Sequence, residues 1–139
     1  MRYHASCAAR DAHGVLLLGP SSSGKSDLLL RLLDRGFALV ADDQVEVGEG
    51  IAQAPAALAG LVEVRGLGIL RLPYQATARL ALAVALGPVP TRLPHPARDP
   101  ELGVPSIALD PWPASAPLRV SLALDCALGL VSQAAGAFA

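Results

Sequence analysis

Eight consecutive residues near the start of the chain have the types and spacing of a phosphate-binding loop. The run Gly19-Pro20-Ser21-Ser22-Ser23-Gly24-Lys25-Ser26 fits the pattern G-x-x-x-x-G-K-[ST] in full. Its two glycines let the backbone approach an anion closely and adopt torsions that a side chain disfavours. The lysine brings a mobile positive charge to the β- and γ-phosphates, and the final serine hydroxyl is a ligand for Mg²⁺. This run predicts a nucleoside triphosphate site and leaves the phosphate acceptor open.

Two neighbouring aspartates, Asp42 and Asp43, directly follow an apolar run at residues 37–41. Consecutive residues of a strand point to opposite sides, so we expect the two carboxylates to have different roles. One would take a proton from an acceptor hydroxyl, and the other would bind Mg²⁺ directly or through water. A solvated turn is the alternative interpretation. A place at the carboxyl end of a strand, where ligands of α/β sheets bind, favours a functional pair.

A third segment, Glu63-Val64-Arg65-Gly66-Leu67-Gly68-Ile69, places two glycines after charged residues at a predicted strand end. Glycines at such a place suggest that the backbone packs closely against a ligand or a partner. Glu63 is a candidate carboxylate for Mg²⁺, and Arg65 is a candidate for stabilising phosphoryl charge. From the residues alone, an ordinary surface ion pair is an equally good interpretation.

His4 lies in the first predicted strand, fifteen residues before Gly19. A histidine titrates near neutral pH and serves as a general acid or base, but a single histidine in a strand is also typical of a structural role. Both roles stay open for His4. His13 and His95 fall in predicted turns, and we interpret them as solvated loop residues.

The elements around the phosphate loop form a predicted strand–helix–strand unit. Residues 15–18 are a short apolar run, typical of a strand buried on both faces. Residues 25–35 carry leucines at helical spacing, and Gly36 stands where a C-terminal cap belongs. Residues 37–41 read as a second buried strand, which we expect to lie beside the first. This unit would bring the aspartates to the border of the phosphate loop.

The rest of the chain is predicted to supply further strands, a proline-rich loop and a terminal helix. Residues 2–9 and 14–18 suit a hairpin with a tight turn. Six prolines make residues 88–105 a predicted surface loop. Further strands are expected at residues 44–47 (an edge strand), 61–64, 80–86, 106–109 and 118–124, and a helix at 125–137. With 139 residues and no internal repeat, the chain is expected to form one domain, 1–139.

Composition narrows the classes of function. Hydrophobic residues make up 53% and charged residues 17%, which excludes a disordered chain. The net charge is −1, Lys25 is the single lysine, and aromatics are only 4%, so neither a nucleic-acid surface nor base stacking on aromatic side chains is expected. The apolar run at residues 15–18 is too short for a membrane span or an export signal. We therefore expect a cytoplasmic protein with reduced Cys7 and Cys126.

Together these motifs resemble the catalytic domain of HPr kinase/phosphorylase. That family carries a P-loop, a strand that ends in V-A-D-D and the signature E-x-R-G-L-G-I, which here are residues 19–26, 40–43 and 63–69. The resemblance covers about residues 1–75 and implies a P-loop α/β fold related to phosphoenolpyruvate carboxykinase. It also implies the short form of some proteobacteria, which lacks the N-terminal regulatory domain. Family members are typically homohexamers.

The resemblance implies an ATP- and Mg²⁺-dependent serine kinase acting on an HPr-like phosphocarrier of the sugar or nitrogen phosphotransferase system. Asp42 would be the base towards the acceptor serine, and the acid in the reverse reaction, in which inorganic phosphate attacks phosphoserine. Asp43, Ser26 and Glu63 would surround Mg²⁺. His4 matches a functional histidine of the family.

The chain departs from the family pattern at three places. Ser22 stands for the second P-loop glycine, Asp27 follows Ser26 where the family has glutamate, and the family loop P-x-R-x-G-R-N has no counterpart, although residues 94–103 contain Arg98. Two alternatives stay open beside the protein kinase. One is a nucleotide-binding regulator without catalysis, and the other is a small-molecule kinase, for which the chain is short.

Overall fold

The apolar run before the phosphate loop forms a strand buried on both faces, as expected. In the computed structural model, which describes residues 1–139, β3 (His13–Leu18) pairs antiparallel with β2 (Ala5–Arg10) and parallel with β9 (Ala78–Leu86). Val15 and Leu16 are both fully buried but belong to different hydrophobic clusters, one on each face of the sheet. Burial on both faces explains why the run is continuously apolar rather than alternating.

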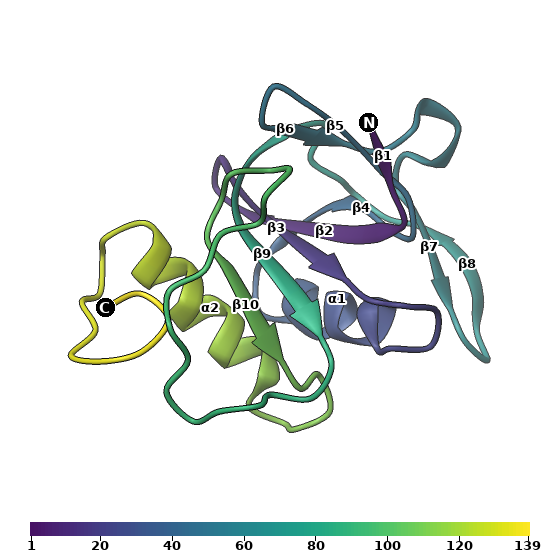
Figure 1. Ribbon diagram of the computed structural model, residues 1–139. Helices are drawn as coiled ribbons and strands as arrows, with labels where there is room; N and C mark the ends of the chain where they lie inside the picture. The colour runs from purple at the N-terminus through teal and green to yellow at the C-terminus, as the bar shows by residue number, and fades with distance from the viewer.

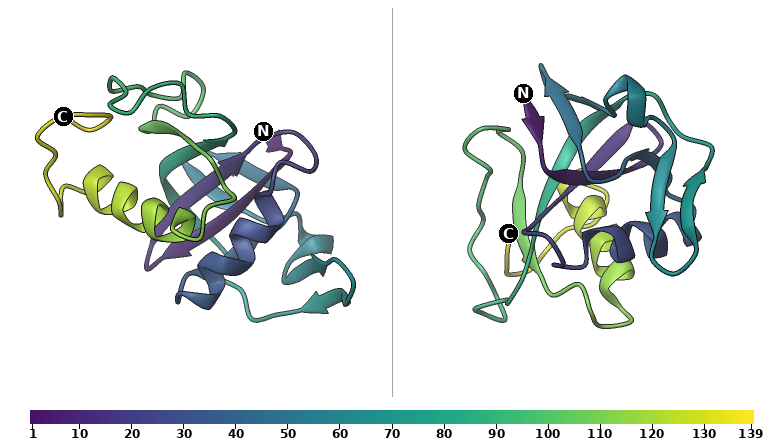
Figure 2. Two further views of the ribbon diagram at one scale, coloured as in Figure 1. Left: turned by 90° about the horizontal axis from the view of Figure 1, so that it is seen from below. Right: turned by 90° about the vertical axis from the view of Figure 1, so that its right-hand side faces the viewer.

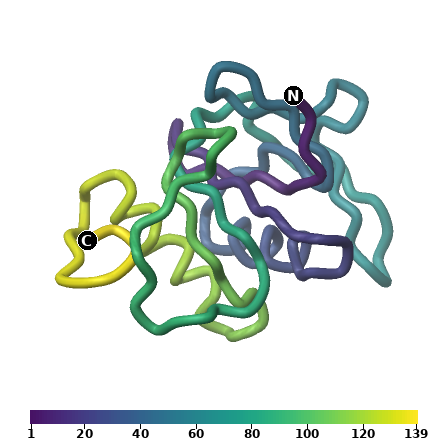
Figure 3. Tube along the Cα trace, viewed as in Figure 1, coloured from purple at the N-terminus to yellow at the C-terminus, as the bar shows by residue number.

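Eight strands form one sheet in the order β1-β5-β6-β9-β3-β2-β4, with β10 parallel to β9 (Figure 1). A separate hairpin, β7–β8, projects beside it. The further strands are β1 (Arg2–Tyr3), β4 (Ala38–Ala41), β5 (Val45–Gly48), β6 (Ile51–Gln53), β7 (Leu61–Val64), β8 (Gly68–Arg71) and β10 (Ser106–Leu109), with a short 3-10 helix at Ala56–Leu58. The predicted strands at residues 61–64, 80–86 and 106–109 are thereby confirmed, and residues 87–105 connect β9 to β10 as a long loop (Figure 3).

Two helices, α1 (Lys25–Asp34) and α2 (Ala116–Ala127), lie on the same face of the sheet (Figure 2, left). Leucines of α1 at helical spacing pack with β3 and β9 and with the buried face of α2 in a cluster of 17 buried residues. The helix begins after Gly24 and ends before Gly36, whose φ of 95° is the left-handed torsion expected of a C-terminal glycine. The predicted helix at residues 25–35 is confirmed.

The opposite face of the sheet is covered by strands from one edge of the same sheet. The strands β1, β5 and β6 curl over it (Figure 1), and a second cluster of 11 buried residues fills the space. Val45 and Val47 of β5 contribute to this cluster together with Cys7, Leu16 and Val40 from the central strands. The result is a mixed α/β fold with a core on each side of one curled sheet. Neither helix has the length and apolar character that crossing a membrane would require.

Two predictions for the C-terminal third are wrong. Residues 118–124, expected as a strand, lie within α2, and residues 125–137, expected as a helix, are mostly irregular because α2 ends at Ala127. A short apolar run does not distinguish a strand from a buried helix by periodicity alone. The discriminating signals are Pro117 in the first turn and the burial of Val120, Ala123 and Leu124, which share one helical face.

Two predicted neighbour relations are also wrong. The strand after α1 does not lie beside β3, because β2 pairs with both β3 and β4 and separates them. The predicted edge strand at residues 44–47 is β5, which has β1 on one side and β6 on the other. In both places the neighbour comes from the first ten residues, and strand order is a non-local property that the local pattern does not report.

Candidate active site

The phosphate loop connects β3 to α1 at the edge of the sheet where β3, β9 and β4 all end. A Cβ added to Gly19 would lie 2.5 Å from Oγ of Ser23, so a side chain there would force Ser23 to move. Gly24 has a φ of 94°, which favours glycine. Ser22, where the resemblance implies a glycine, takes a left-handed φ of 63°, an unfavourable torsion for a residue with a side chain. Both glycines of the motif thus stand at places that favour glycine over other residues.

Lys25 is folded over its own loop. Its side chain is buried, with 6% exposure, and Nζ donates to the carbonyl oxygens of Gly19 at 2.6 Å and Pro20 at 2.8 Å. The Oγ atom of Ser23 is also buried and has no hydrogen-bond partner. A buried ammonium and an unpaired hydroxyl inside one backbone curl are groups that an anion satisfies. The residues present therefore fit a phosphate group in this loop.

Asp42 faces the start of α1. Its Oδ1 accepts hydrogen bonds from the Ser26 hydroxyl at 2.9 Å and the Ser6 hydroxyl at 3.1 Å. Its Oδ2 lies 3.4 Å from the amide nitrogen of Glu63. One carboxylate thus joins α1, β2 and β7. A serine hydroxyl and a carboxylate oxygen next to a phosphate loop are the hard oxygen ligands that Mg²⁺ uses.

Asp43 faces outward, although it is the next residue. It has a φ of 69°, and the amide of Gln44 donates to the carbonyl of Asp42 at 2.8 Å, so the chain makes a γ-turn centred on Asp43. Its side chain is 61% exposed, and Oδ1 lies 3.0 Å from Nε2 of His4. A left-handed torsion in a residue with a side chain is a strained conformation typical of functional sites. This carboxylate is open to an incoming group.

Ser6 is a site residue that the sequence analysis missed. It is fully buried in β2, and its hydroxyl donates to Oδ1 of Asp42 and accepts from the amide of Asp43 at 3.2 Å. The side chain therefore bridges the two aspartates and supports the strained turn between them. The available signal was a serine within the apolar stretch of a buried strand, since a buried hydroxyl needs a polar partner.

The β7–β8 hairpin meets the site at one point. The Glu63 amide approaches Asp42, while the Glu63 side chain is exposed. Arg65 is exposed in the turn and forms no ion pair with another residue of the chain. No three side chains of the His, Cys, Asp or Glu types gather into a metal cluster anywhere in the chain. Of the residues predicted to hold Mg²⁺, Ser26 forms a hydrogen bond with Asp42 and not with Asp43.

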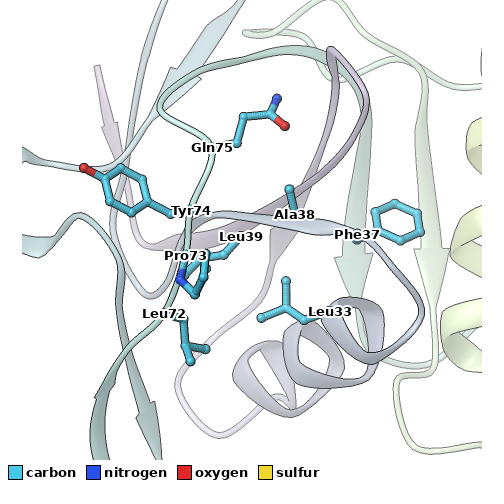
Figure 4. A pocket seen from close by; sticks show the side chains of 8 residues that line it. All are labelled: Leu33, Phe37, Ala38, Leu39, Leu72, Pro73, Tyr74 and Gln75. Carbon is cyan, nitrogen blue, oxygen red and sulfur yellow. The ribbon is translucent and has the colours of Figure 1, made fainter.

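An apolar hollow lies away from this site. A cavity of about 500 Å³ opens between the end of α1, the start of β4 and residues 72–75 (Figure 4). Leu33, Phe37 and Leu39 line one side and Leu72, Pro73 and Tyr74 the other. This is the opposite end of both α1 and β4 from Lys25 and Asp42, and the lining carries no acid or base suited to phosphoryl transfer. The candidate active site therefore lies at the phosphate loop and not in this cavity.

Comparison with known proteins agrees with this geometry. A family model described as the HPr Serine kinase C-terminal domain matches residues 1–75. The HPr kinase/phosphorylase of Aromatoleum aromaticum is 40% identical over 136 residues, which is 83% of this chain and 42% of that protein. The HPr kinase/phosphorylase of Clostridium tetani is 45% identical over 64 residues, or 43% of this chain and 21% of that protein. The chain thus spans less than half the length of these relatives.

A solved structure resembles almost the whole fold. The HPr(Ser) kinase/phosphatase from Coxiella burnetii superposes with a TM-score of 0.78 at 26% sequence identity. The match covers 94% of this chain and 92% of that one. The likeness therefore extends past residue 75, where the family model ends.

Proposed function

This chain belongs to the HPr serine kinase C-terminal domain family, and we propose that it transfers the γ-phosphoryl group of ATP to a serine of an HPr-like phosphocarrier protein. The observation that carries the proposal is the different setting of the two aspartates beside one phosphate loop. Asp42 is bonded to Ser26, and Asp43 is open to solvent beside His4. Phosphoryl transfer uses a carboxylate at the metal and a residue that accepts the proton of the acceptor hydroxyl, and we assign these roles to the two adjacent aspartates.

The nucleotide would be held by the loop at residues 19–26. Lys25 would leave the carbonyl oxygens of its own loop and pair with the β- and γ-phosphates, which the backbone amides also bind. Ser26 and Asp42 would hold Mg²⁺, and Glu63, whose amide approaches Asp42, would lie close to it. When bound, Mg²⁺ neutralises the charge that develops on the transferring phosphoryl group.

Asp43 would serve as the base, which reverses the division of roles that the family resemblance implied. The carboxylate of Asp42 already accepts two hydroxyl hydrogen bonds at Oδ1, whereas Asp43 faces outward. Asp43 takes the proton of the acceptor serine as the serine oxygen bonds to the γ-phosphorus. The bond from that phosphorus to its bridging oxygen breaks, and ADP leaves with the electron pair. In the reverse direction the protonated acid returns a proton to the departing serine oxygen.

His4 and Arg65 would act around this base. His4 contacts Asp43 directly, and this contact would help to orient the exposed carboxylate. Arg65 lies in the turn directly after β7, two residues beyond Glu63, and its side chain is exposed. The free guanidinium is suited to the charge of an incoming phosphoryl group.

Phosphate transfer from labelled ATP tests the proposal. The chain, MgCl₂ and ATP labelled at the γ-phosphate are incubated with HPr-like phosphocarriers from the same genome, and the labelled residue is mapped by mass spectrometry. We expect label on one serine, and none on a carrier in which that serine is alanine. Labelling of a small metabolite, or ATP binding without any turnover, would replace this proposal with one of the two alternatives.

We also propose that the chain forms homo-oligomers. The outer face of α2 and the segment after it expose four aliphatic side chains, each at least 42% exposed: Leu118, Leu122, Leu130 and Val131. Leu118 and Leu122 are four residues apart and share one helical face, which supports a contact between copies. Light scattering coupled to size exclusion tests it: a larger assembly that Leu122→Glu reduces would support it, whereas a monomer for the unaltered chain would contradict it.

A further inference from the structure

The turn after β10 lies at the phosphate-binding edge of the sheet. β10 is parallel to β9, and β9 is parallel to β3, so all three strands end on the same side. In open α/β sheets this carboxyl edge is where ligands bind. Residues 110–115 leave β10 there and lead into α2, and Figure 2 (left) shows that this turn lies beside the start of α1.

This turn touches the phosphate loop through Pro111 and Trp112. A Cβ added to Gly24 would lie 3.1 Å from Cγ of Pro111 and 3.3 Å from Cη2 of Trp112. Gly24 is the last glycine of the motif, and Lys25 follows it directly. The benzene edge of the indole therefore rests against the backbone from which the phosphate-binding lysine starts.

The turn is held in place on α1. The Trp112 amide donates to Oδ1 of Asp110 at 3.1 Å, which closes a local turn. The guanidinium of Arg31 donates to the carbonyl oxygens of Pro111 and of Pro113, the latter at 3.2 Å. Two prolines restrict the backbone further. Trp112 thus stands on a supported turn rather than on a free loop.

The indole is nevertheless open. Trp112 is 64% exposed, while Pro111 next to it is buried. The chain has one tryptophan, two tyrosines and two phenylalanines, so an exposed indole is a large part of its aromatic surface. Tyr74, which is 51% exposed, lines the cavity at the other end of α1. Trp112 is the aromatic side chain that contacts the phosphate loop.

We propose that Trp112 is a stacking platform for the base of the nucleotide whose phosphates occupy the loop. The inference rests on the proposed function, because it needs a nucleotide there. The backbone amides and the lysine of the loop bind the phosphates, but they make no contact with the nucleoside. A π-face at the rim of the loop supplies that contact, and stacking accepts any base because every base has a π-face. The ligand class is therefore a nucleoside triphosphate, with its base against the indole.

A comparison of ATP with inorganic tripolyphosphate isolates the contribution of the base. Both ligands are titrated with Mg²⁺ into the full chain by calorimetry. We expect ATP to bind about tenfold or more tightly than tripolyphosphate, the scale of one base on one aromatic ring. Trp112→Ala should lower the affinity for ATP to that for tripolyphosphate and leave tripolyphosphate unchanged, and Trp112→Phe should keep part of the difference. Tyr74→Ala is the matched control and should keep all of it.

The single tryptophan offers a second readout. Its fluorescence reports Trp112 alone, so ATP should quench the emission of the unaltered chain and tripolyphosphate should not. Two results would contradict the stacking role of Trp112 without affecting the phosphate site. One is a Trp112→Ala variant that still binds ATP more tightly than tripolyphosphate. The other is tryptophan emission that changes with protein concentration but not with ATP. If neither ATP nor tripolyphosphate binds, the proposed function itself fails and this inference fails with it.

Discussion

Ser26 and Asp42 lie 2.9 Å apart from oxygen to oxygen and connect the first turn of α1 to the end of β4. The contact joins the helix that follows β3 to the end of β4, and β2 lies between β3 and β4 in the sheet. It places a carboxylate beside the hydroxyl that follows the phosphate-binding lysine, where Mg²⁺ bound to a triphosphate finds its protein ligands. It also leaves Asp43, on the other side of the peptide, outside this pair.

Replacing each aspartate by asparagine should give two different defects. Asp43→Asn removes the proposed base, and we expect the maximal rate of transfer to fall by about 10²- to 10⁴-fold while ATP affinity is kept. Asp42→Asn removes a proposed metal ligand, and we expect the Mg²⁺ requirement to rise by at least about tenfold. Steady-state kinetics over a Mg²⁺ titration measure both. If Asp42→Asn loses the rate at saturating Mg²⁺ and Asp43→Asn does not, the roles are those that the family resemblance implied.

Removing the Ser6 hydroxyl should misplace both aspartates at once. Ser6→Ala leaves the Asp43 amide and Oδ1 of Asp42 each with one partner fewer in a partly buried place, at a cost in stability of about 1 kcal/mol or more. We expect the rate of transfer to fall, the Mg²⁺ requirement to rise, and the KM for ATP to change little. Ser6→Thr keeps the hydroxyl and should recover much of the rate.

A control separates positioning from general destabilisation. Val47 is buried in the same cluster that packs against β2 and contacts neither aspartate by a hydrogen bond. Val47→Ala should lower the free energy of unfolding by a similar amount and leave the rate and the Mg²⁺ requirement unchanged. Equal kinetic defects in Ser6→Ala and Val47→Ala would mean that Ser6 acts only through stability.

Neutralising Lys25 should abolish nucleotide binding. In Lys25→Met the phosphate charge stays unmatched inside the loop, and we expect ATP affinity to fall by about a hundredfold or more, the cost of removing one partner of a buried charge pair. Arg35→Met, an exposed basic residue at the other end of α1, is the control and should bind ATP normally. Calorimetry with MgATP measures both, and undiminished affinity in Lys25→Met would show that the nucleotide binds elsewhere.

Local signals in the sequence predicted the parts of the site that are contiguous in the chain. The phosphate loop, the strand before it, α1 and the strand of Glu63 follow from spacing and composition over a few residues. The relations among them did not follow. The partner of Ser26 is Asp42, and the support for both aspartates is Ser6, because β2 lies between β3 and β4, and strand order depends on contacts far apart in sequence.

Trp112 is a second example of a residue whose proposed role could not be predicted from the sequence. A composition of 4% aromatics argued against stacking surfaces, yet one indole at one place is sufficient for one base. Its place depends on β10 lying parallel to β9 and on Arg31 of α1 holding the turn. The aromatic content is an average over the whole chain, whereas a binding site needs only one aromatic side chain that the fold places beside it.

Burial makes the two thiols differ in reactivity. Complete burial in β2 raises the pKa of Cys7 to about 12, whereas Cys126 is partly exposed in α2. At pH 8 a disulfide reagent should therefore modify one thiol of the folded chain, and none in Cys126→Ala, because the thiolate is the nucleophile. Both thiols should react in guanidinium chloride. The same burial makes stability depend on pH. Between pH 9.0, which is its ordinary pKa, and pH 12, Cys7 is deprotonated in the unfolded chain but keeps its proton in the folded chain. The free energy of unfolding should therefore fall as the pH rises from 9 to 12. Rapid labelling of Cys7 in folded Cys126→Ala would show that β2, and with it the support for Asp42 and Asp43, opens to solvent in the native state.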